Sequence, residues 1–434
     1  MTEQVRHDTR LDRFVDNYSD RTQGMRVSAV RALFAVANRP EIVSLAGGMP
    51  NIADLPLAGI ADSMAEMIRT RGTQVMQYGS GQGEPGFREQ ILSVMALEGI
   101  TAHPDDVVVT AGSQQGLDLV TRIFCNPGDV ILAESPSYVG ALGTFLSYQT
   151  EVVHVTSDDN GINPEALRET IANVQAQGKK IKFLYTIPNY NNPSGVTQPL
   201  ARRQEVVEIC HTAGVLVVED NPYGLLSLDA EPIPAMRSLN DEVIYLGSFS
   251  KTFAPGFRVG WVLAPHAVRE KLVLAQESAT LCPPVFSQFA IGNYLTNHDW
   301  LGQVHIFRDM YRERRDAMLT TLSEVMPAGT SWTRPAGGFF VWVTLPEGLD
   351  SQAMLPRGVN ARVAFVPGSA FYADGQGARN VRLSFCFPPA DRIQLGVKRF
   401  ADVVRRELEV MSTFGVHTSP IEPRMPSGPA PDLS

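Results

Sequence analysis

Seven short apolar runs, separated by stretches of helix length, constrain the fold of this chain more than any other feature. They cover residues 107–110, 130–134, 151–155, 181–185, 215–219, 243–247 and 259–264. Near-continuous apolar strands that alternate with helices are typical of a mostly parallel sheet with both faces covered. The pattern therefore predicts an α/β fold whose large domain is built on a mostly parallel, seven-stranded sheet.

The pattern changes after Pro283. Residues 288–325 have the spacing of one or two long helices. Their charged positions, which we interpret as a solvated helix face, are Arg308, Arg312, Arg314, Arg315 and Asp316. Residues 337–343, 363–367 and 381–385 resemble strands of a smaller α+β domain, and a last helix is expected over 390–410. A length of 434 residues also favours about two domains.

The ends of the chain differ from its middle. Residues 1–20 are polar and are expected to be a flexible N-terminus, whereas 24–37 has helical spacing. Residues 413–434 are rich in Pro and Ser and are expected to be a disordered tail. The domain boundaries that we predict are 21–60 for an N-terminal arm or small-domain segment, 61–300 for the large domain and 301–412 for the small C-terminal domain.

Composition excludes several classes of protein. The formal net charge is −9 without a long basic run, so nucleic acid is not an expected partner. The four cysteines lie far apart without a CxxC pair, which argues against a disulfide framework or a metal site and favours a reducing, cytoplasmic location. Residues 1–14 lack the apolar core of a signal peptide, and no stretch approaches the roughly 20 apolar residues that span a membrane.

Distinctive side chains follow five of the predicted strands. They are Ser113, Tyr138, Asn192, Asp220 and Lys251. The carboxyl ends of parallel strands meet at one edge of a sheet, which is where ligands bind. A lysine suits an aldehyde, a carboxylate suits a cationic ring nitrogen and an aromatic ring offers a stacking face. Hydroxyls, an arginine and a helix N-terminus suit a phosphate. Pyridoxal 5′-phosphate has all four of these features.

Three motifs resemble a known family. They are Ser248-Phe249-Ser250-Lys251 with Arg258, Asn192-Pro193-Ser194-Gly195, and Asp220-x-x-Tyr223. Together they resemble the fold-type I, class I/II pyridoxal-phosphate aminotransferases, with the closest likeness to the 2-aminoadipate, kynurenine and aromatic aminotransferase group. The likeness extends from about Arg26 to about Val410. It implies the fold of that family, and an enzyme that moves an amino group between an amino acid and a 2-oxo acid.

The resemblance also implies roles for single residues around the cofactor. Lys251, Asp220 and Tyr223 would be catalytic: Lys251 as the Schiff-base lysine, Asp220 as the partner of the pyridinium nitrogen, and Tyr223 with Asn192 as donors to the phenolic oxygen. Tyr138 would stack on the ring. The phosphate would be held by Ser113, Gln114, Ser248, Ser250 and Arg258. Tyr78 would reach the phosphate of a neighbouring subunit, which implies a homodimer with shared sites.

Substrate recognition is implied in the same way. Arg382 would bind the α-carboxylate, and Gly48 and Asn192 would lie against the substrate. The donor would be an acidic, aromatic or aliphatic L-amino acid, and the acceptor a 2-oxo acid such as 2-oxoglutarate. Ser28 and Arg31 would lie beside the substrate side chain. Arg31 would either pair with a distal carboxylate or be an exposed helix arginine.

Two other functions fit the same motifs. A pyridoxal-phosphate lyase, decarboxylase or ring-forming synthase shares Lys251, Asp220 and Arg382, because these reactions differ only in which α-carbon bond is cleaved. A non-catalytic effector domain of a transcription regulator uses the same fold, although the roughly 40 residues before Glu41 are few for a DNA-binding domain. Taken singly, each site residue also has a structural interpretation, such as a helix cap for Asp220 or a surface ion pair for Arg258.

Overall fold

The large sheet has the architecture that the apolar runs predict. The computed structural model describes residues 14–22 and 39–414. Within these residues the sheet contains eight strands, in the spatial order β2 (Val107–Thr110), β9 (Gly260–Leu263), β8 (Ile244–Ser248), β7 (Leu216–Asp220), β6 (Ile181–Thr186), β3 (Val130–Ser135), β4 (Glu151–Asp158) and β5 (Gly161–Ile162). The seven expected strands are present, and β5 is a two-residue addition that is too short to give a sequence pattern.

Most neighbouring strands run parallel. The pairs β3–β4, β3–β6, β6–β7 and β7–β8 are parallel, whereas β9 is antiparallel to both β8 and β2. β2 therefore has the same direction as β8. Since β2, β3, β6, β7 and β8 all point the same way, the segments that follow them emerge at one edge of the sheet.

Side chains alternate between the two faces of the sheet, and each face is covered by helices. In β6, Phe183 and Tyr185 pack in one core and Leu184 packs in a second core. Helices α4 (Ser113–Phe124), α5 (Val139–Ser147) and α8 (His266–Thr280) contribute to the first core, and α6 (Pro164–Ala176) and α7 (Leu200–Thr212) contribute to the second. This double cover explains why the strands are apolar at nearly every position.

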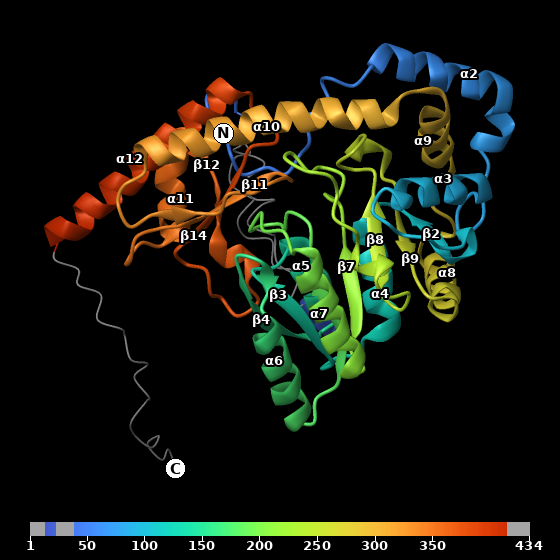
Figure 1. The fold of residues 1–434 in the computed structure, drawn as a ribbon, viewed down its shortest axis with the longest axis horizontal. Coiled ribbons are helices and arrows are strands. Elements are labelled where there is room, and N and C mark those ends of the chain that lie inside the picture. The colour runs from blue at the N-terminus through green and yellow to red at the C-terminus, as the bar shows by residue number, and fades with distance from the viewer. Residues whose placement is uncertain (1–13, 23–38, 415–434) are drawn as a thin grey trace, which may run out of the picture.

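The remaining helices extend the molecule at both ends. Figure 1 shows α2 (Leu57–Val75), α3 (Pro85–Ala96) and α9 (Val285–Asn297) near α8 on one side of the large sheet. A smaller unit lies on the other side. Its sheet is antiparallel, in the order β10 (Ser331–Trp332), β11 (Phe340–Thr344), β14 (Asn380–Ser384) and β13 (Val366–Pro367). Its helices are α11 (Ser351–Asn360) and α12 (Ala390–Phe414). No helix of the described ranges is long and apolar enough to cross a membrane.

The smaller unit also contains a strand from near the N-terminus. β1 (Val43–Ser44) pairs in parallel with β12 (Val363–Ala364). The predicted helix over 24–37 lies outside the described residues, and so does the predicted tail from 415 onward. Residues 413 and 414 belong to α12, so the predicted tail boundary at 413 is two residues too early. The short 3-10 helices Val15–Asn17 and Asp20–Thr22 lie within the segment that we expected to be flexible.

Two predicted strands of the smaller unit have different limits in the structure. Residues 337–339 do not belong to β11, because Gly337 forms a bridge with Ser227 and Gly338 donates its N–H to Leu226 O, 3.1 Å away. The run at 363–367 is divided between two sheets: β12 pairs with β1, and β13 pairs with β14. Both differences come from long-range pairing, which a local pattern does not encode.

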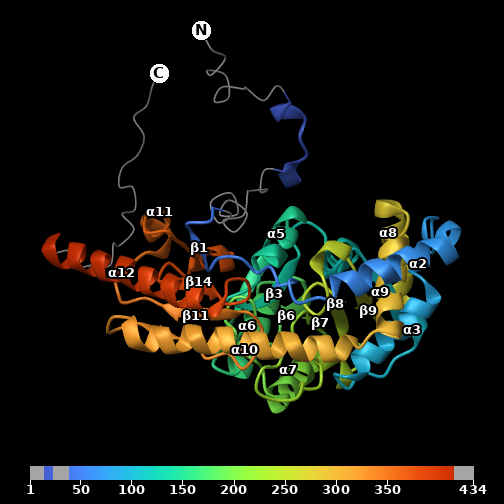
Figure 2. The same cartoon turned by 90° about the horizontal axis from the view of Figure 1, so that it is seen from above.

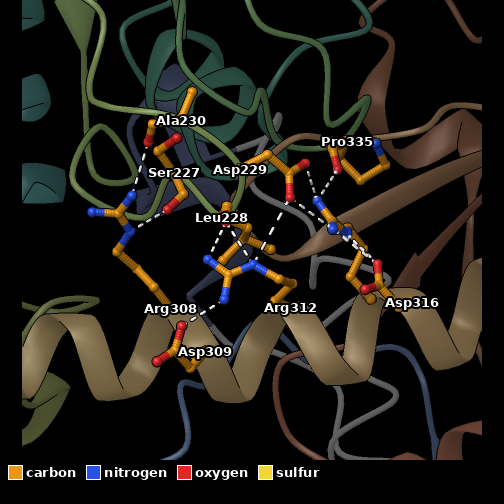
Figure 3. A network of polar contacts seen from close by, with 10 residues as sticks. Ser227, Leu228, Asp229, Ala230, Arg308, Asp309, Arg312, Asp316 and Pro335 are labelled. Atoms are coloured by element: carbon orange, nitrogen blue, oxygen red, sulfur yellow. Dashed lines mark hydrogen bonds and ion pairs between the residues drawn. The ribbon is translucent and has the colours of Figure 1, made fainter.

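Helix α10 (Trp300–Val325) runs along the length of the molecule from α9 to α12 (Figures 1 and 2). Its charged side chains were predicted to form a solvated face. This prediction is wrong for Arg315, which is buried, whereas Arg308, Arg312 and Arg314 are half-buried and Asp316 is exposed. Figure 3 shows Arg308 and Arg312 directed at the segment 227–230. Arg308 donates to the carbonyl oxygens of Ser227 and Ala230, and Arg312 donates to Leu228 O, 2.7 Å from its Nε.

Arg315 and Arg314 continue these contacts. Arg315 is buried, binds both oxygens of the Asp229 carboxylate and donates to Pro335 O, 3.2 Å away. Arg314 donates to Cys386 O at 2.6 Å. The charges of α10 therefore hold irregular segments of the chain whose carbonyl groups would otherwise lack partners.

Candidate active site

A cavity of about 600 Å³ opens at the carboxyl edge of the large sheet. It is lined by nearly all the residues that the sequence singled out, namely Gly48, Ser113, Gln114, Tyr138, Asn192, Asp220, Tyr223, Ser248, Ser250, Lys251, Arg258 and Arg382. Strands β11 and β14 of the smaller sheet and the segment around Gly48 close the cavity from the other side, through Phe340, Arg382 and Gly48. The site thus lies between the two units.

Lys251 is held in this cavity as an amine with few partners. Its Nζ donates to Gly48 O at 2.9 Å and lies 5.8 Å from the centre of the Phe339 ring. The pKa of Lys251 is lowered to about 8. Burial is the largest cause, the nearby charges of Arg382 and Arg258 contribute, and Cys386 opposes the shift. Near physiological pH, a substantial fraction of lysine side chains with this pKa is neutral. The neutral amine is the form that attacks an aldehyde.

Asp220 presents an unsatisfied carboxylate oxygen. It ends strand β7, is 5% exposed, and its Oδ2 accepts from Tyr185 Oη at 2.8 Å. Its Oδ1 is buried and has no hydrogen-bond partner among the described residues. The pKa of Asp220 is raised to about 6. Burial is the largest cause, the hydrogen bond from Tyr185 opposes it, and the charge of Glu219 adds to it. A buried carboxylate with a free oxygen fits a cationic group such as the protonated ring nitrogen of pyridoxal 5′-phosphate.

The opposite end of the cavity suits a phosphate. Helix α4 begins at Ser113, directly after Gly112, which has a φ of +84°. The guanidinium of Arg258 lies against this turn and donates to Ala111 O at 2.8 Å. A Cβ at residue 112 would lie only 2.6 Å from Arg258 Nη2, so glycine is required there for both reasons. A helix N-terminus beside an arginine is a ready site for an anion.

Side-chain hydroxyls complete that end. Ser248 Oγ donates to Ser250 Oγ at 2.9 Å and accepts from Ser250 N–H at 3.1 Å. The Gln114 amide, in contrast, donates to Thr144 Oγ1 at 2.8 Å on helix α5. Gln114 therefore lines the cavity while its amide group is used to join α4 to α5.

Arg382 lies at the side of the cavity formed by the smaller sheet. It is 2% exposed, and its Nη1 and Nη2 donate to Asn192 Oδ1 at 2.8 Å and to Ala46 O at 2.6 Å. Its Nε is buried without a partner among the described residues. The guanidinium carbon lies 4.2 Å from the Phe340 ring centre, and burial lowers the Arg382 pKa to about 10. A buried, incompletely paired guanidinium is suited to a carboxylate.

Two tyrosines border the same space. Tyr138 precedes helix α5, and a Cβ at Gly140 would lie 2.5 Å from its ring, so this glycine makes room for Tyr138. Tyr223 is buried and packs edge-on against Phe339, with 5.4 Å between ring centres. Burial is also the largest cause of the raised pKa of each phenol.

One described residue of the predicted site does not line this cavity. The Tyr78 side chain does not line it, and the residue is 77% exposed. Ser28 and Arg31 lie outside the described residues. Among the described residues, no three His, Cys, Asp or Glu side chains gather in a way that could hold a metal ion.

The prediction missed several residues that the cavity uses. Apolar wall residues that the sequence did not single out are Met49, Val139, Ile187, Pro222 and Phe340. Tyr185, the donor to Asp220, was missed because it lies inside an apolar strand. Its phenol was the only available signal, since a tyrosine buried in a sheet usually needs a hydrogen-bond partner.

Comparison with known proteins gives the family. Residues 42–400 match the family model "Aminotransferase class I and II". The aromatic-amino-acid aminotransferase 1 of Thermococcus litoralis is 40% identical over 401 residues, which cover 90% of this chain and 95% of that protein. The kynurenine aminotransferase of Pyrococcus horikoshii, solved with PMP, has a TM-score of 0.86 at 39% identity, with 90% of this chain and 97% of that chain covered.

A third relative carries a cofactor adduct in its structure. It is LysN, the α-aminoadipate aminotransferase of Thermus thermophilus, solved with N-(5′-phosphopyridoxyl)-L-leucine. Its TM-score is 0.84 at 32% identity, with 91% of this chain and 99% of that chain covered. With the family model spanning most of the sequence, these matches show that the chain belongs to the class I and II aminotransferases, the fold-type I enzymes that use pyridoxal 5′-phosphate.

Proposed function

We propose that this enzyme transfers the amino group of an aromatic or aliphatic L-amino acid to a 2-oxo acid such as 2-oxoglutarate, with Lys251 as the catalytic amine. The observation that carries the proposal is the single cavity in which Lys251, Asp220 and Arg382 meet. Bound pyridoxal 5′-phosphate supplies an aldehyde for amines and a cationic ring that withdraws electrons from the substrate α-carbon. The following steps concern what the residues of this chain do.

Lys251 has two tasks in this proposal. Its neutral Nζ binds the cofactor aldehyde, and the lowered pKa of about 8 favours that neutral state. When the substrate amine takes its place, the released Nζ accepts the proton of the substrate α-carbon, as a general base, and later returns a proton as a general acid. Both tasks require the amine to move within the cavity, and its hydrogen bond with Gly48 O is one that it can exchange.

Asp220 and Tyr185 act on the ring nitrogen. The free Oδ1 of Asp220 accepts the N–H of the protonated ring, and the Tyr185 phenol keeps the carboxylate oriented through Oδ2. Tyr223, Asn192 and Tyr138 line the cavity. Tyr223 and Asn192 would serve the phenolic oxygen of the bound cofactor, and Tyr138 would stack on its ring. Ser113, Ser248, Ser250 and Arg258, with the start of α4, hold the phosphate.

Arg382 binds the α-carboxylate that donor and acceptor share. Its Nε is free, and its Nη1 contact with Asn192 places the amide beside the same carboxylate. Because one guanidinium serves both half-reactions, the two substrates compete for one site. Bidentate pairing of guanidinium and carboxylate fixes the orientation of the α-carbon toward Lys251.

The walls of the cavity support an apolar or aromatic donor. Met49, Val139, Ile187 and Phe340 line the cavity. Within the part of the chain that the structure describes, the cations that line the cavity are Lys251, Arg258 and Arg382, each of which already has a role. Two relatives are named for aromatic amino acids and kynurenine. An acidic donor would depend on Arg31, which lies outside the described residues.

We further propose a cytoplasmic homodimer in which Tyr78 reaches the cofactor phosphate of the other subunit. The exposed Tyr78, Met76 and Leu281 side chains support an interface at this part of the surface. The four cysteines, all free, support a reducing compartment.

The amino-donor half-reaction tests this function. The purified enzyme with pyridoxal 5′-phosphate is mixed with single amino acids, and absorbance reports conversion to the pyridoxamine form. Phenylalanine, kynurenine and leucine are expected to convert it, and so is glutamate, because glutamate is the product that the acceptor 2-oxoglutarate yields at the same site. Loss of carbon dioxide or of a side-chain fragment without conversion would instead identify a decarboxylase or lyase. If Arg31→Ala lost the same share of activity with every donor, this would argue against a role of Arg31 in the recognition of acidic substrates.

A further inference from the structure

A hydrogen-bonded network of buried polar side chains lies outside the cavity, and the mechanism above does not use it. Its centre is Glu98, which follows helix α3 and is 4% exposed. Glu98 Oε1 accepts from Asn221 Nδ2 at 2.6 Å, and Oε2 accepts from Tyr245 Oη at 2.9 Å. Asn221 Oδ1 in turn accepts from Asn189 Nδ2 at 2.9 Å. Arg203 is the last member of this network and donates to Asn189 Oδ1.

This network joins two loops of the active site. Asn221 directly follows Asp220 and is two residues before Tyr223. Asn189 is three residues before Asn192 in the loop after β6. The Asn221 side chain therefore fixes the loop after β7, through its bonds with Glu98 and Asn189 and a longer contact, 3.4 Å, with Tyr245 Oη on β8. Its backbone N–H is also bound, to Leu246 O at 2.9 Å, so the residue has little freedom.

The protein is shaped around the carboxylate of Glu98. A Cβ at Gly224 would lie 1.8 Å from Glu98 Oε1, so only glycine allows the loop after Tyr223 to pass this close. The backbone of Glu98 is anchored as well, since its carbonyl oxygen accepts from Ala235 N–H at 2.9 Å. Such close contact means that a change at Glu98 is transmitted to residues 221–224 without an intervening side chain.

The environment of Glu98 allows a neutral group at this position. Burial raises the pKa of Glu98 to about 7, and the charge of Glu219 raises it further, whereas the bonds from Asn221 and Tyr245 and the charge of Arg203 lower it. A glutamine could offer its oxygen to Asn221 and its amide N–H to the Tyr245 oxygen. An apolar side chain could do neither and would leave the Asn221 amide unpaired.

We propose that Glu98 is a positioning residue for the reaction: by holding Asn221, it sets where Asp220 and Tyr223 stand relative to the cofactor ring. This inference rests on the proposed function, because it concerns the same site. Glu98 itself touches neither cofactor nor substrate, since it does not line the cavity. A shift of about 1 Å in a catalytic group can lower the rate on the order of 100-fold.

The test compares Glu98→Leu with Glu98→Gln in the full-length enzyme. Five quantities are measured: the Kd of pyridoxal 5′-phosphate, the pH midpoint of the bound cofactor's absorbance change, kcat, KM, and the Tm of the apo-enzyme. We expect Glu98→Leu to lower kcat about 10- to 100-fold, raise the cofactor Kd and shift the midpoint, with KM changed much less. Glu98→Gln is expected to stay within about threefold of wild type in kcat.

Two other variants separate positioning from folding. Tyr245→Phe removes the second donor to Glu98 and the longer contact of Asn221 Nδ2, at 3.4 Å, but it keeps the Asn221–Glu98 bond of 2.6 Å, so we expect the midpoint of the wild type. Asn221→Ala removes the link itself and should reproduce the loss of Glu98→Leu, and it decides the matter should Glu98→Leu fail to fold. A wild-type midpoint and wild-type kcat in Glu98→Leu or Asn221→Ala, even with a lowered Tm, would overturn the proposal. So would an equal loss in Tyr245→Phe.

The wild-type half-reaction is run beside these variants. If the wild type does not form the pyridoxamine product, the proposed function fails. The role of Glu98 is still decided in that case by the Kd and the absorbance midpoint, because neither requires turnover.

Discussion

At the scale of single residues, the site contains charged groups whose protein partners are incomplete. Asp220 Oδ1 and Arg382 Nε are buried without partners in the described part of the chain, although a buried charge is normally paired. Burial raises the pKa of Asp220 to about 6 and lowers the pKa of Lys251 to about 8. Each deviation lowers the stability of the apo-enzyme and favours the ligand that restores the missing contact.

We predict that Asp220→Asn makes the apo-enzyme more stable while it weakens cofactor binding. The Asp220 pKa is about 6 in the folded state and near 4 when unfolded, so the wild type loses stability as pH rises from about 4 to about 6, and the whole cost persists above 6. Asparagine removes this cost, which is about 1–3 kcal/mol. The apo-enzyme Tm at pH 8 should rise by about 2–4 °C.

Lowering the pH is the internal control for this variant. The advantage of Asp220→Asn should shrink below pH 6, where the wild-type carboxyl is itself protonated. A variant that is less stable than wild type at pH 8 would contradict the explanation. Scanning calorimetry of both apo-enzymes from pH 4.5 to pH 8 measures the difference, with buffers chosen at about one-unit intervals.

Lys251 gives a kinetic prediction. Because only the neutral amine attacks an aldehyde, capture of pyridoxal 5′-phosphate by the apo-enzyme should speed up with pH, about tenfold per unit, until it levels off near pH 8. Stopped-flow absorbance follows the capture. Lys251→Ala should show none, and a rate that keeps rising about tenfold per unit well above pH 8 would argue against a lowered pKa.

The sequence identified the polar residues that line the cavity but not the residues that support them. Lys251, Asp220 and Asn192 could be found because they are polar groups at the ends of apolar strands. Tyr185 and Glu98 could not, since each is a single polar residue in an apolar stretch, and its partner lies far away in the sequence. Long-range hydrogen bonds of this kind depend on the complete fold.

At the scale of elements, helix α10 connects irregular segments from several parts of the chain. Arg315 holds Asp229 and Pro335 O, while Trp300 Nε1 donates to Thr252 O, next to Lys251, at 3.1 Å. Asn51 donates its N–H to Tyr311 Oη at 3.0 Å. The helix therefore contacts segments that adjoin Lys251 and Gly48, and it fixes their relative positions.

We predict that Arg315→Ala destabilises the enzyme by about 1–3 kcal/mol, because it leaves the Asp229 carboxylate and Pro335 O without their donor. Arg69→Ala is the matched control. Its guanidinium is exposed and pairs with Glu66 one turn away, so its loss should cost about 0–0.5 kcal/mol. Thermal unfolding of both variants gives the comparison, and equal Tm values would contradict the role of Arg315.

The strands of the large sheet were predicted closely, and the arginine face of α10 was not. Runs such as 181–185 are apolar on both faces, and this pattern has few other structural solutions. The charges of α10 have the spacing of a solvated face, and nothing in the local sequence shows that the 227–230 segment covers them. Helical periodicity identifies the helix, but the chemistry of what packs on it is set by the tertiary structure.

At the scale of the whole molecule, the proposed dimer makes a prediction that needs two mutant chains. In a heterodimer of Lys251→Ala and Tyr78→Ala chains, one site carries both defects and the other carries neither, provided that Tyr78 acts across the interface. Mixing and refolding the two inactive or weakened homodimers should therefore restore activity, to roughly half of the wild-type value per heterodimer. Unchanged activity after mixing would show that Tyr78 serves its own subunit or no site.

The pairing of β1 with β12 brings residue 43 beside residue 363. The segment that leads from β1 to Gly48 therefore acquires its place only after more than three quarters of the polypeptide has been synthesised. When Lys251 and Asp220 of a nascent chain have already left the ribosome, the chain still lacks the smaller sheet, which forms the opposite side of the cavity. Translation thus completes the catalytic chamber near its end, and a truncated chain that stops before the smaller sheet would expose reactive groups without enclosing a substrate.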